Sequence, residues 1–253
     1  MIEGAVPREI REGPAAIRAT VEVARADARR IARGWLAAGI DRVHVIGNGT
    51  SFHSSLAAAT LYRHRAGPDD PVVIPVTAAE FLLYAPRLGP RDAIVGISSS
   101  GEFKDVVAVA EAVRGRFPMA GIVHVPGSTL TTVASDVVLS AGGPSTVPVM
   151  TKTFSSTLVA TELLLVELLG KEAADAEATR ILAAADAAEA AIAAAEPLAE
   201  PLAESLRDAR HVFVTGGGVA YPAALEAALK LKEMALVHAE GAEVWEMTSG
   251  AAT

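Results

Sequence analysis

"VHVIGNGTSFHSS", residues 43–55, joins a short apolar run to a glycine turn that is rich in hydroxyl side chains. The apolar run lacks a clean alternation of period two, which is typical of a strand that is buried on both faces. After the turn, the chain reads as a helix that ends near Gly67. This stretch therefore predicts one strand–turn–helix unit of a parallel sheet.

The same order of elements recurs in the residues that follow. The apolar runs at 93–97 and 121–125 are each followed by a turn and a helical segment, and 71–81 and 136–141 add further strands. Strands that alternate with helices indicate βαβ units. The predicted fold class is therefore α/β, with a parallel sheet and helices packed on it.

Longer helical patterns flank these units. Residues 15–38 carry apolar side chains at alternating steps of three and four, which predicts an amphipathic helix. Residues 151–170 form an apolar helical pattern, and an alanine-rich stretch continues to residue 210 with breaks near Pro197 and Pro201. Because alanine is the strongest helix former, we interpret this stretch as a helical connector between domains, not as disorder.

From residue 211 the first pattern starts again. At a constant offset of 169 positions, Gly47 and Gly49 fall on Gly216 and Gly218, which indicates a duplicated unit. The second copy stops after one strand and one helix, which cannot bury their own faces, so we expect a fragment or a chain completed by another polypeptide. The predicted segments are an N-terminal helical segment, a first domain, the connector and the start of a second domain, at 1–34, 35–170, 171–208 and 209–253.

Composition narrows the class of function. The net charge is −8 and 4% of the residues are aromatic, whereas nucleic-acid binders usually combine a basic face with stacking aromatics. No apolar run approaches the roughly 18 residues of a membrane span, and the first residues lack the apolar segment of a secretory signal. We therefore expect a cytoplasmic protein with neither a nucleic acid nor a membrane as partner.

Cysteine and histidine usage argues against metal chemistry. The chain has no cysteine, which removes disulfides, thiol nucleophiles and cysteine-based metal sites. None of the 6 histidines pair as HxH or HExxH, so no metal site is expected. We expect no other cofactor either.

Hydroxyl side chains follow two strands at the points where these strands end. In open α/β sheets ligands bind at the carboxyl ends of the strands, and the helices that follow direct free N–H groups at anions. The hydroxyl groups predicted to hold a phosphate are those of Thr50, Ser51, Ser98, Ser99 and Ser100. The alternative is that they are helix N-caps, each worth about 1 kcal/mol. The second copy has Val219 and Ala220 in place of the Thr-Ser pair, which favours the anion site.

The helix of the second copy carries Glu226, Lys230 and Glu233 on one face. These residues form either a surface salt-bridge stripe or a carboxylate base beside a lysine. A glutamate with a raised pKa could abstract a proton next to a carbonyl.

Three more residues are candidates for the same site. Lys152 opens the helical segment at 151–170, where a positive charge is unfavourable to the helix dipole and indicates a nearby anion. His238 and Glu246 follow the second helix in a segment that reads as a loop. For His238 alone, a structural role is the competing interpretation.

Five short motifs occur in a specific order: "GNGTSFHS", "ISSSGE", "VPGSTL", "TKTF" and "ALKLKE" with "HAEG" after it. Together they resemble the SIS (sugar isomerase) phosphosugar-binding family, above all the isomerase half of glucosamine-6-phosphate synthase and stand-alone phosphosugar isomerases and deaminases. The resemblance runs from about residue 30 to the end of the sequence. It implies two SIS domains, each a five-stranded parallel sheet in a three-layer αβα sandwich, and a homodimer that binds a small sugar phosphate.

The resemblance also implies roles for particular residues. The five hydroxyl residues would hold the phosphate, Glu233 would shuttle a proton between the first two sugar carbons, and Lys230 would lie beside it. The implied function is an aldose–ketose isomerase, or a deaminase or deglycase, that acts on a hexose or aminohexose 6-phosphate. The alternatives are a sugar-phosphate-binding module without catalysis and a structural protein whose serines are only caps.

The sequence departs from the family pattern at four positions. Phe103 ends the SxSGxT motif, Ser99 stands where the family often has glutamine, and Met150 replaces a serine. Ser249 stands where the ring-opening histidine is expected, and a serine hydroxyl cannot replace an imidazole as general acid–base. The glutamine-hydrolysing half of the synthase needs an N-terminal cysteine, so this chain does not encode it.

Overall fold

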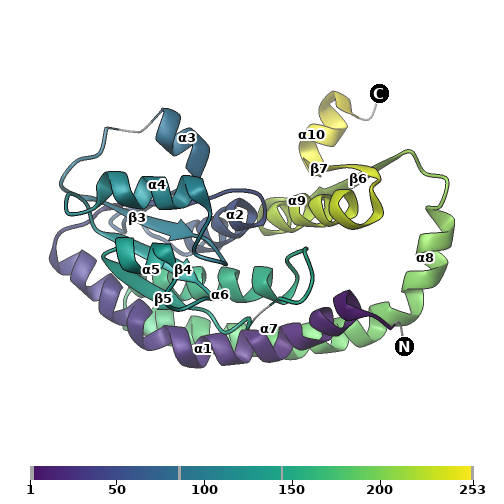
Figure 1. The fold of residues 1–253 in the computed structure, drawn as a ribbon, viewed down its shortest axis with the longest axis horizontal. Helices are drawn as coiled ribbons and strands as arrows, with labels where there is room; N and C mark the ends of the chain where they lie inside the picture. Colours follow the sequence, from purple (N-terminus) through teal and green to yellow (C-terminus); the bar gives the residue numbers. More distant parts are fainter. Residues whose placement is uncertain (1–2, 85–86, 144, 252–253) are drawn as a thin grey trace.

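The computed structural model describes residues 3–84, 87–143 and 145–251, and it consists of a larger first unit and a smaller second unit (Figure 1). The strands of the first unit are β1 (Arg42–Gly47), β2 (Val72–Thr77), β3 (Asp92–Ile97), β4 (Met119–Val123) and β5 (Asp136–Leu139). They form one parallel sheet in the order β2-β1-β3-β4-β5. The predicted α/β fold with a five-stranded parallel sheet is thereby confirmed.

Helices cover both faces of this sheet, so the unit has three layers. They are α1 (Ala5–Ala37), α2 (Thr50–Arg63), α3 (Ala78–Leu83), α4 (Lys104–Val113), α5 (Thr129–Val133) and α6 (Lys152–Val166). Val45 of β1 belongs to the core under α1, α2 and α6, whereas its neighbour Ile46 belongs to the core under α3, α4 and α5. Because both faces are buried, the strands are apolar at successive positions, as the sequence indicated.

Helix α1 is longer than the predicted 15–38, since it begins at Ala5 and continues through Pro14. A proline inside a helix removes one backbone hydrogen bond, so Pro14 favours a helix start after it. The predicted start of this helix was therefore too late. In the structure Glu9, Gly13 and Pro14 are buried. Tertiary packing of the first helical turns therefore overrides the local preference.

The alanine-rich stretch is helical and carries the chain to the second unit. It comprises η1 (Glu167–Leu169), α7 (Lys171–Ala195), η2 (Glu196–Leu198) and α8 (Ala199–Ser205). Helix α7 lies alongside α1 (Figure 1), and Arg29 of α1 pairs with both Glu167 and Asp175. The stretch therefore connects the units and also packs on the first.

The second unit has two strands, not the single strand that the sequence suggested. It comprises β6 (His211–Gly216), η3 (Gly218–Ala220), α9 (Tyr221–Lys230), η4 (Leu231–Ala235), β7 (His238–Glu243), α10 (Val244–Glu246) and η5 (Met247–Ala251). β6 and β7 pair in parallel from His211 opposite His238 to Gly216 opposite Glu243. The sequence indicated a loop where β7 lies, because the motif "HAEG" contains glycine and lacks the β-branched residues that are typical of strands. The last two residues of the predicted segment 209–253 lie outside the described residues.

Over the described ranges, no helix combines the length and the apolar character needed to cross a membrane.

Candidate functional site

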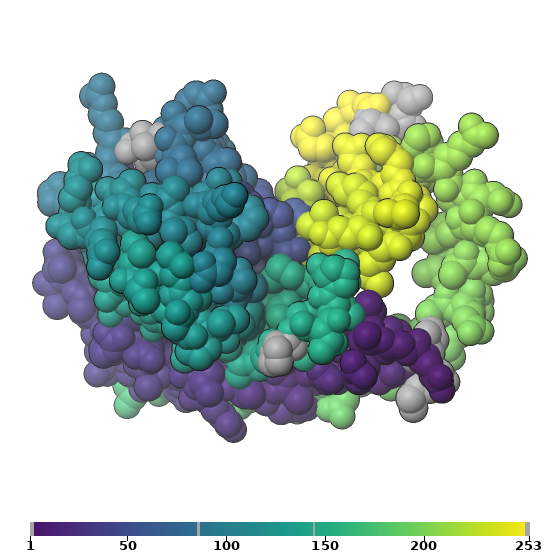
Figure 2. Space-filling view, viewed as in Figure 1, coloured from purple at the N-terminus to yellow at the C-terminus, as the bar shows by residue number. Residues whose placement is uncertain are grey.

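A pocket of about 460 Å³ lies between the two units, where Figure 2 shows the surface hollowed. Four segments line it: the turn between β1 and α2, the turn between β3 and α4, the loop before α6, and the end of α9 with η4. The lining residues are Asn48, Gly49, Thr50, Ser51, Ser98, Ser99, Ser100, Phe103, Pro148, Met150, Leu229 and Glu233. The structure thus brings together all five predicted phosphate ligands and the predicted base.

The turn between β1 and α2 depends on two glycines. A Cβ on Gly47 would lie 2.7 Å from the carbonyl carbon of Ser51, and Gly49 has a φ of +53°. Helix α2 begins at Thr50 with no side chain capping it. Its first N–H groups therefore lack a side-chain partner, and the N-cap interpretation of Thr50 and Ser51 is wrong.

The serine turn after β3 holds itself together through its own hydroxyl groups. The Ser98 hydroxyl accepts a hydrogen bond from the Phe103 N–H at 3.2 Å, and the Ser100 hydroxyl accepts one from the Glu102 N–H at 3.2 Å. A hydroxyl that accepts one bond still has a proton to donate. Both serines therefore shape the turn and keep a donor for an anion.

Gly101 allows the serine turn to approach its neighbours closely. Its φ is +72°, and a Cβ there would lie 1.9 Å from the Ser128 hydroxyl oxygen. Glu102 then ties the turn to α5, because its carboxylate accepts bonds from the Thr129 N–H at 2.8 Å and the Thr129 hydroxyl at 2.7 Å. These bonds, the one from the backbone first, lower the pKa of Glu102.

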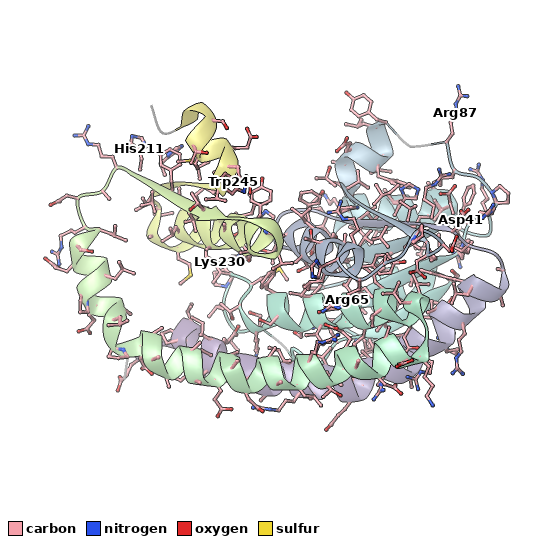
Figure 3. All side chains as sticks on the ribbon, turned by 180° about the vertical axis from the view of Figure 1, so that it is seen from behind. Asp41, Arg65, Arg87, His211, Lys230 and Trp245 are labelled. Atoms are coloured by element: carbon pink, nitrogen blue, oxygen red, sulfur yellow. The ribbon has the colours of Figure 1, made fainter. Side chains whose placement is uncertain are left out.

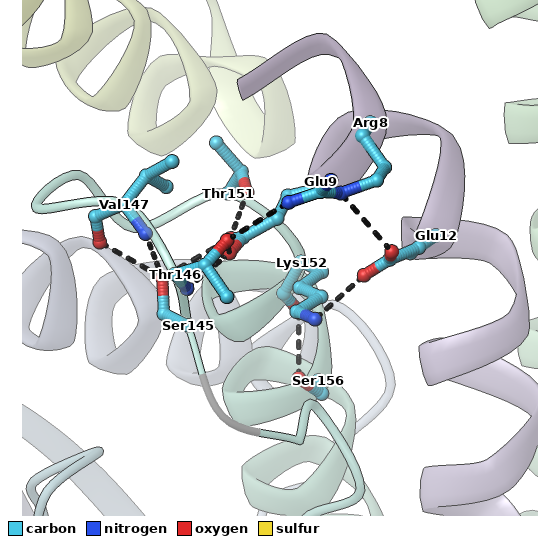
Figure 4. Close-up of polar contacts among 9 residues, drawn as sticks. All are labelled: Arg8, Glu9, Glu12, Ser145, Thr146, Val147, Thr151, Lys152 and Ser156. Carbon is cyan, nitrogen blue, oxygen red and sulfur yellow. Dashed lines mark hydrogen bonds and ion pairs between the residues drawn. The ribbon is translucent and has the colours of Figure 1, made fainter. Parts of the chain in front are cut away.

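The loop before α6 is fixed by a buried carboxylate that the sequence analysis did not single out. Glu9 of α1 accepts hydrogen bonds from the hydroxyl groups of Thr146 at 2.9 Å and Ser145 at 3.1 Å (Figure 4). Burial raises the pKa of Glu9, but the bonds from Thr146 and Ser145 outweigh it and lower the pKa overall. Glu9 thus positions the loop that carries Pro148 and Met150 to the pocket wall.

Lys152 points away from this pocket. Its Nζ lies 2.6 Å from Oε2 of Glu12 on α1 (Figure 4), and its side chain lines a neighbouring cavity of about 310 Å³ together with Glu226 and Lys230. The anion that the sequence indicated near this helix N-terminus is therefore the Glu12 carboxylate of the chain itself.

The acidic face of α9 is not a surface stripe, because Glu226 is only 5% exposed. Its Oε1 accepts a bond from the Thr50 hydroxyl at 2.9 Å, and its Oε2 lies 2.7 Å from Nδ1 of His53. Lys230 Nζ lies 3.1 Å from Glu226 and also pairs with Glu233. Two residues of α2, two of α9 and one of η4 thus form one network across the units.

This network decides the charge of Glu226 and the role of Thr50. Burial raises the pKa of Glu226, but the bonds from His53, Lys230 and Thr50 together bring it below its ordinary value, so the group is an anion near neutrality. The single hydroxyl proton of Thr50 goes to this carboxylate, and the Thr50 hydroxyl oxygen accepts a bond from Lys230 Nζ at 3.2 Å. In this arrangement Thr50 has only its backbone N–H to offer a ligand in the pocket.

Two of the predicted sugar-site residues lie outside the pocket. His238 is exposed, and its ring packs edge-on against His211 with ring centres 5.0 Å apart. Glu246 is exposed on α10. Figure 3 shows His211 at the outer end of the second unit and Lys230 on the side toward the first unit. This position agrees with the alternative interpretation, in which His238 has a structural role and does not contact the sugar.

Asn48 and His53 make contacts next to the pocket that their sequence motif alone did not indicate. Asn48 donates to Asp105 at 2.8 Å and accepts from the Ala78 N–H at 3.1 Å, so it ties the β1 turn to α4 and α3. His53 lies three positions after Thr50, a spacing that places both on one helix face and could have indicated a shared partner.

The pocket chemistry suits a small anion with a polar body. Among the described residues that line it, Glu233 is the single ionisable one, so an anion would be held by hydroxyl donors and helix N-termini. No three His, Cys, Asp or Glu side chains converge as metal ligands within the described part of the chain.

Comparison with known proteins agrees with the sequence resemblance. The family model described as "SIS domain" matches residues 38–167. An isomerizing glutamine–fructose-6-phosphate aminotransferase from Pyrobaculum aerophilum is 33% identical over 249 residues, covering 96% of this chain and 40% of the relative. The chain thus spans about 40% of the length of such relatives.

Solved structures share the fold. The C-terminal domain of a glucosamine-fructose-6-phosphate aminotransferase from Francisella tularensis superposes with a TM-score of 0.82 at 22% identity, covering 98% of this chain and 72% of that one. A glucosamine-6-phosphate deaminase from Thermotoga maritima superposes with a TM-score of 0.69 at 19% identity, covering 93% of this chain and 72% of that one.

Proposed function

The chain belongs to the SIS domain family, and on that premise we propose that it binds a hexose or aminohexose 6-phosphate and moves a proton between its first two carbons. The reaction is an aldose–ketose isomerisation or a related deamination or deglycation. The observation that carries the proposal is one pocket that is lined both by hydroxyl groups at the N-termini of two helices of the first unit and by Glu233 of the second unit.

The hydroxyl-lined wall is the phosphate end of the proposed site. Ser51, Ser98 and Ser100 would donate to the phosphate oxygens, and the N-termini of α2 and α4 add partial positive charge. Hydrogen bonds to charged groups are worth about 1.5 to 3 kcal/mol each. Such donors can hold a dianion without a lysine or arginine in the wall.

Glu233 is the base in the proposed reaction. Its carboxylate takes the proton from the carbon next to the carbonyl, the C–H electron pair forms a C=C bond, and the C=O π pair moves to the carbonyl oxygen, which takes a proton from solvent. Glu233 then returns its proton to the former carbonyl carbon, while the other hydroxyl of the enediol loses its proton to solvent and becomes the new carbonyl. For an amino sugar the intermediate is an enamine. Lys230, paired with Glu233, orients the carboxylate.

A non-catalytic phosphosugar-binding module is the second candidate. Ser249, which stands where a ring-opening histidine is expected, is exposed on η5 and donates to the Trp245 carbonyl at 2.9 Å. No histidine is among the described residues that line the pocket. A ring-closed sugar would then be bound but not converted.

Turnover separates the two candidates. Purified protein is assayed for interconversion of fructose 6-phosphate and glucose 6-phosphate, and of glucosamine 6-phosphate with its ketose product. We expect Glu233→Gln to reduce the rate by about 10² to 10⁴-fold, whereas the exposed Glu240→Gln has no effect. Full activity of Glu233→Gln contradicts the proposed base, and binding without turnover in the wild type favours the module.

A further inference from the structure

His53 occupies a specific place next to the pocket without lining it. It lies one turn into α2, its side chain is 14% exposed, and its Nδ1 contacts Oε2 of Glu226 at 2.7 Å. A carboxylate oxygen can only accept a hydrogen bond, so Nδ1 carries the proton and donates it. His53 is therefore anchored in the first unit and bonded to the second.

Glu226 cannot keep its position without such donors. It is a buried anion, and the loss of a donor from a buried charge is costly. Its other partners are the Thr50 hydroxyl at 2.9 Å and the Lys230 ammonium at 3.1 Å. Lys230 is the same ammonium group that pairs with Glu233, so any rearrangement around Glu226 reaches the carboxylate at the pocket.

We propose that His53 is a positioning residue that acts through Glu226 and Lys230 to hold the Glu233 carboxylate over the hydroxyl-lined pocket. The inference rests on the proposed function for the role of Glu233, but the geometric link between α2 and α9 stands apart from it. Since His53 does not line the pocket, its loss changes the placement of the base and leaves the phosphate donors in place.

The experiment compares three substitutions of His53 with a control on the same helix. Asparagine places its amide nitrogen near the position of Nδ1, glutamine places it near Nε2, and alanine removes the donor. His64→Ala, at the exposed end of α2, is the control. Each full-length variant is measured for turnover of fructose 6-phosphate, affinity for inorganic phosphate, and backbone hydrogen exchange across 221–235.

In the expected result, His53→Ala lowers kcat by about 10 to 100-fold, since a small misplacement of a catalytic group has an effect of this size. KM and the Kd for inorganic phosphate stay within about twofold of the wild-type values. Exchange across 221–235 becomes faster. His53→Asn restores kcat and exchange to near wild type, and His53→Gln does not. Should the alanine variant fail to fold, the contrast between asparagine and glutamine gives the same answer.

Three outcomes overturn the proposal: unchanged kcat in His53→Ala, equal behaviour of the asparagine and glutamine variants, or a phosphate Kd that weakens in step with kcat. If the wild type converts no hexose phosphate, the proposed catalysis fails separately. Hydrogen exchange then decides the positioning role, because unchanged exchange across 221–235 in His53→Gln contradicts it.

Discussion

The turns after β1 and β6 are built alike but carry different chemistry. A Cβ on Gly47 would lie 2.7 Å from a backbone atom of Ser51, and one on Gly216 would lie 2.4 Å from a backbone atom of Ala220. Gly49 and Gly218 both have positive φ, at +53° and +56°. Hydroxyl residues follow the first turn, whereas Val219 and Ala220 follow the second. The glycines therefore make the turn, and the hydroxyl groups are not needed to form it.

The two units also differ in how far their strands are buried. In β1 five of the six residues are buried, whereas β6 alternates between exposed and half-buried positions before Gly216. The first unit has its own core on both faces of the sheet. The second contributes α9 and η4, and Glu226 of α9 accepts a bond from Thr50 in the hydroxyl turn of the first. The pocket is thus a junction between a turn that bears hydroxyl groups and a helical segment that bears carboxylates.

The largest expected effect comes from removing the hydroxyl groups that only the first unit has. The double variant Ser98→Ala with Ser100→Ala should weaken binding of glucosamine 6-phosphate by about 100-fold or more, because two bonds to a charged group are lost. Titration calorimetry measures it, with the exposed Ser205→Ala as control. Affinity within threefold of wild type would leave these serines as turn-forming residues only.

The turn glycines provide the next test. Gly47→Ala should lower the free energy of unfolding by about 2 kcal/mol, since the new Cβ meets backbone that must shift. Gly216→Ala should disturb the second unit but leave the main thermal transition of the first unit unchanged. Gly34→Ala, where a Cβ meets nothing within 4 Å, is the control for thermal melting. Equal losses at Gly47 and Gly34 would contradict the steric argument.

A buried carboxyl group of the first unit should also make the free energy of unfolding depend on pH. Burial, together with the nearby Glu177 carboxyl, raises the pKa of Glu162 to about 8 from 4.5, although Arg65 opposes this. The folded state thus favours the protonated acid, so this contribution is complete below about pH 4.5 and is lost as the pH rises through 8.

Glu162→Gln should remove that loss. At pH 9 the variant should be more stable than wild type by about 1 to 2 kcal/mol, and near pH 5 the two should be similar. Urea unfolding at both pH values measures the difference, with the exposed Glu172→Gln as control. A variant that is less stable at pH 9 would show that the Glu162 charge is fully compensated by Arg65.

The smallest expected effect comes from giving the second turn the residues of the first. Val219→Thr with Ala220→Ser should change the affinity for glucosamine 6-phosphate by less than about twofold, because the two new hydroxyl groups are one set of donors and we expect a sugar phosphate to need a second set. The serine turn after β3 supplies that second set only at the first unit. A new phosphate site seen by titration would mean that the turn sequence alone is sufficient.

The fold was largely predictable because its signals are local. Apolar runs without period two, each followed by a glycine turn, predicted the parallel sheet correctly. The sequence missed β7, whose "HAEG" lacks β-branched residues, and it began α1 too late because Pro14 is a local helix breaker. Both elements depend on pairing or packing with distant residues.

The candidate site was predicted in its parts but not in its connections. The hydroxyl turns and Glu233 line one pocket, yet nothing in the local sequence links Thr50 to Glu226 across 176 positions. The same holds for Lys152, whose partner Glu12 belongs to a helix far away in the chain. The domain boundaries, the homodimer and the cytoplasmic location stay predictions.

The most direct test of the central claim is proton exchange on a bound sugar phosphate. Proton NMR follows the C1 hydrogens of fructose 6-phosphate incubated with the protein in D₂O. We predict that the wild type replaces one of them with deuterium, and that Glu233→Gln does so at least about 100-fold more slowly while still binding the phosphate. Undiminished exchange by Glu233→Gln would contradict Glu233 as the base, and the account of the pocket with it.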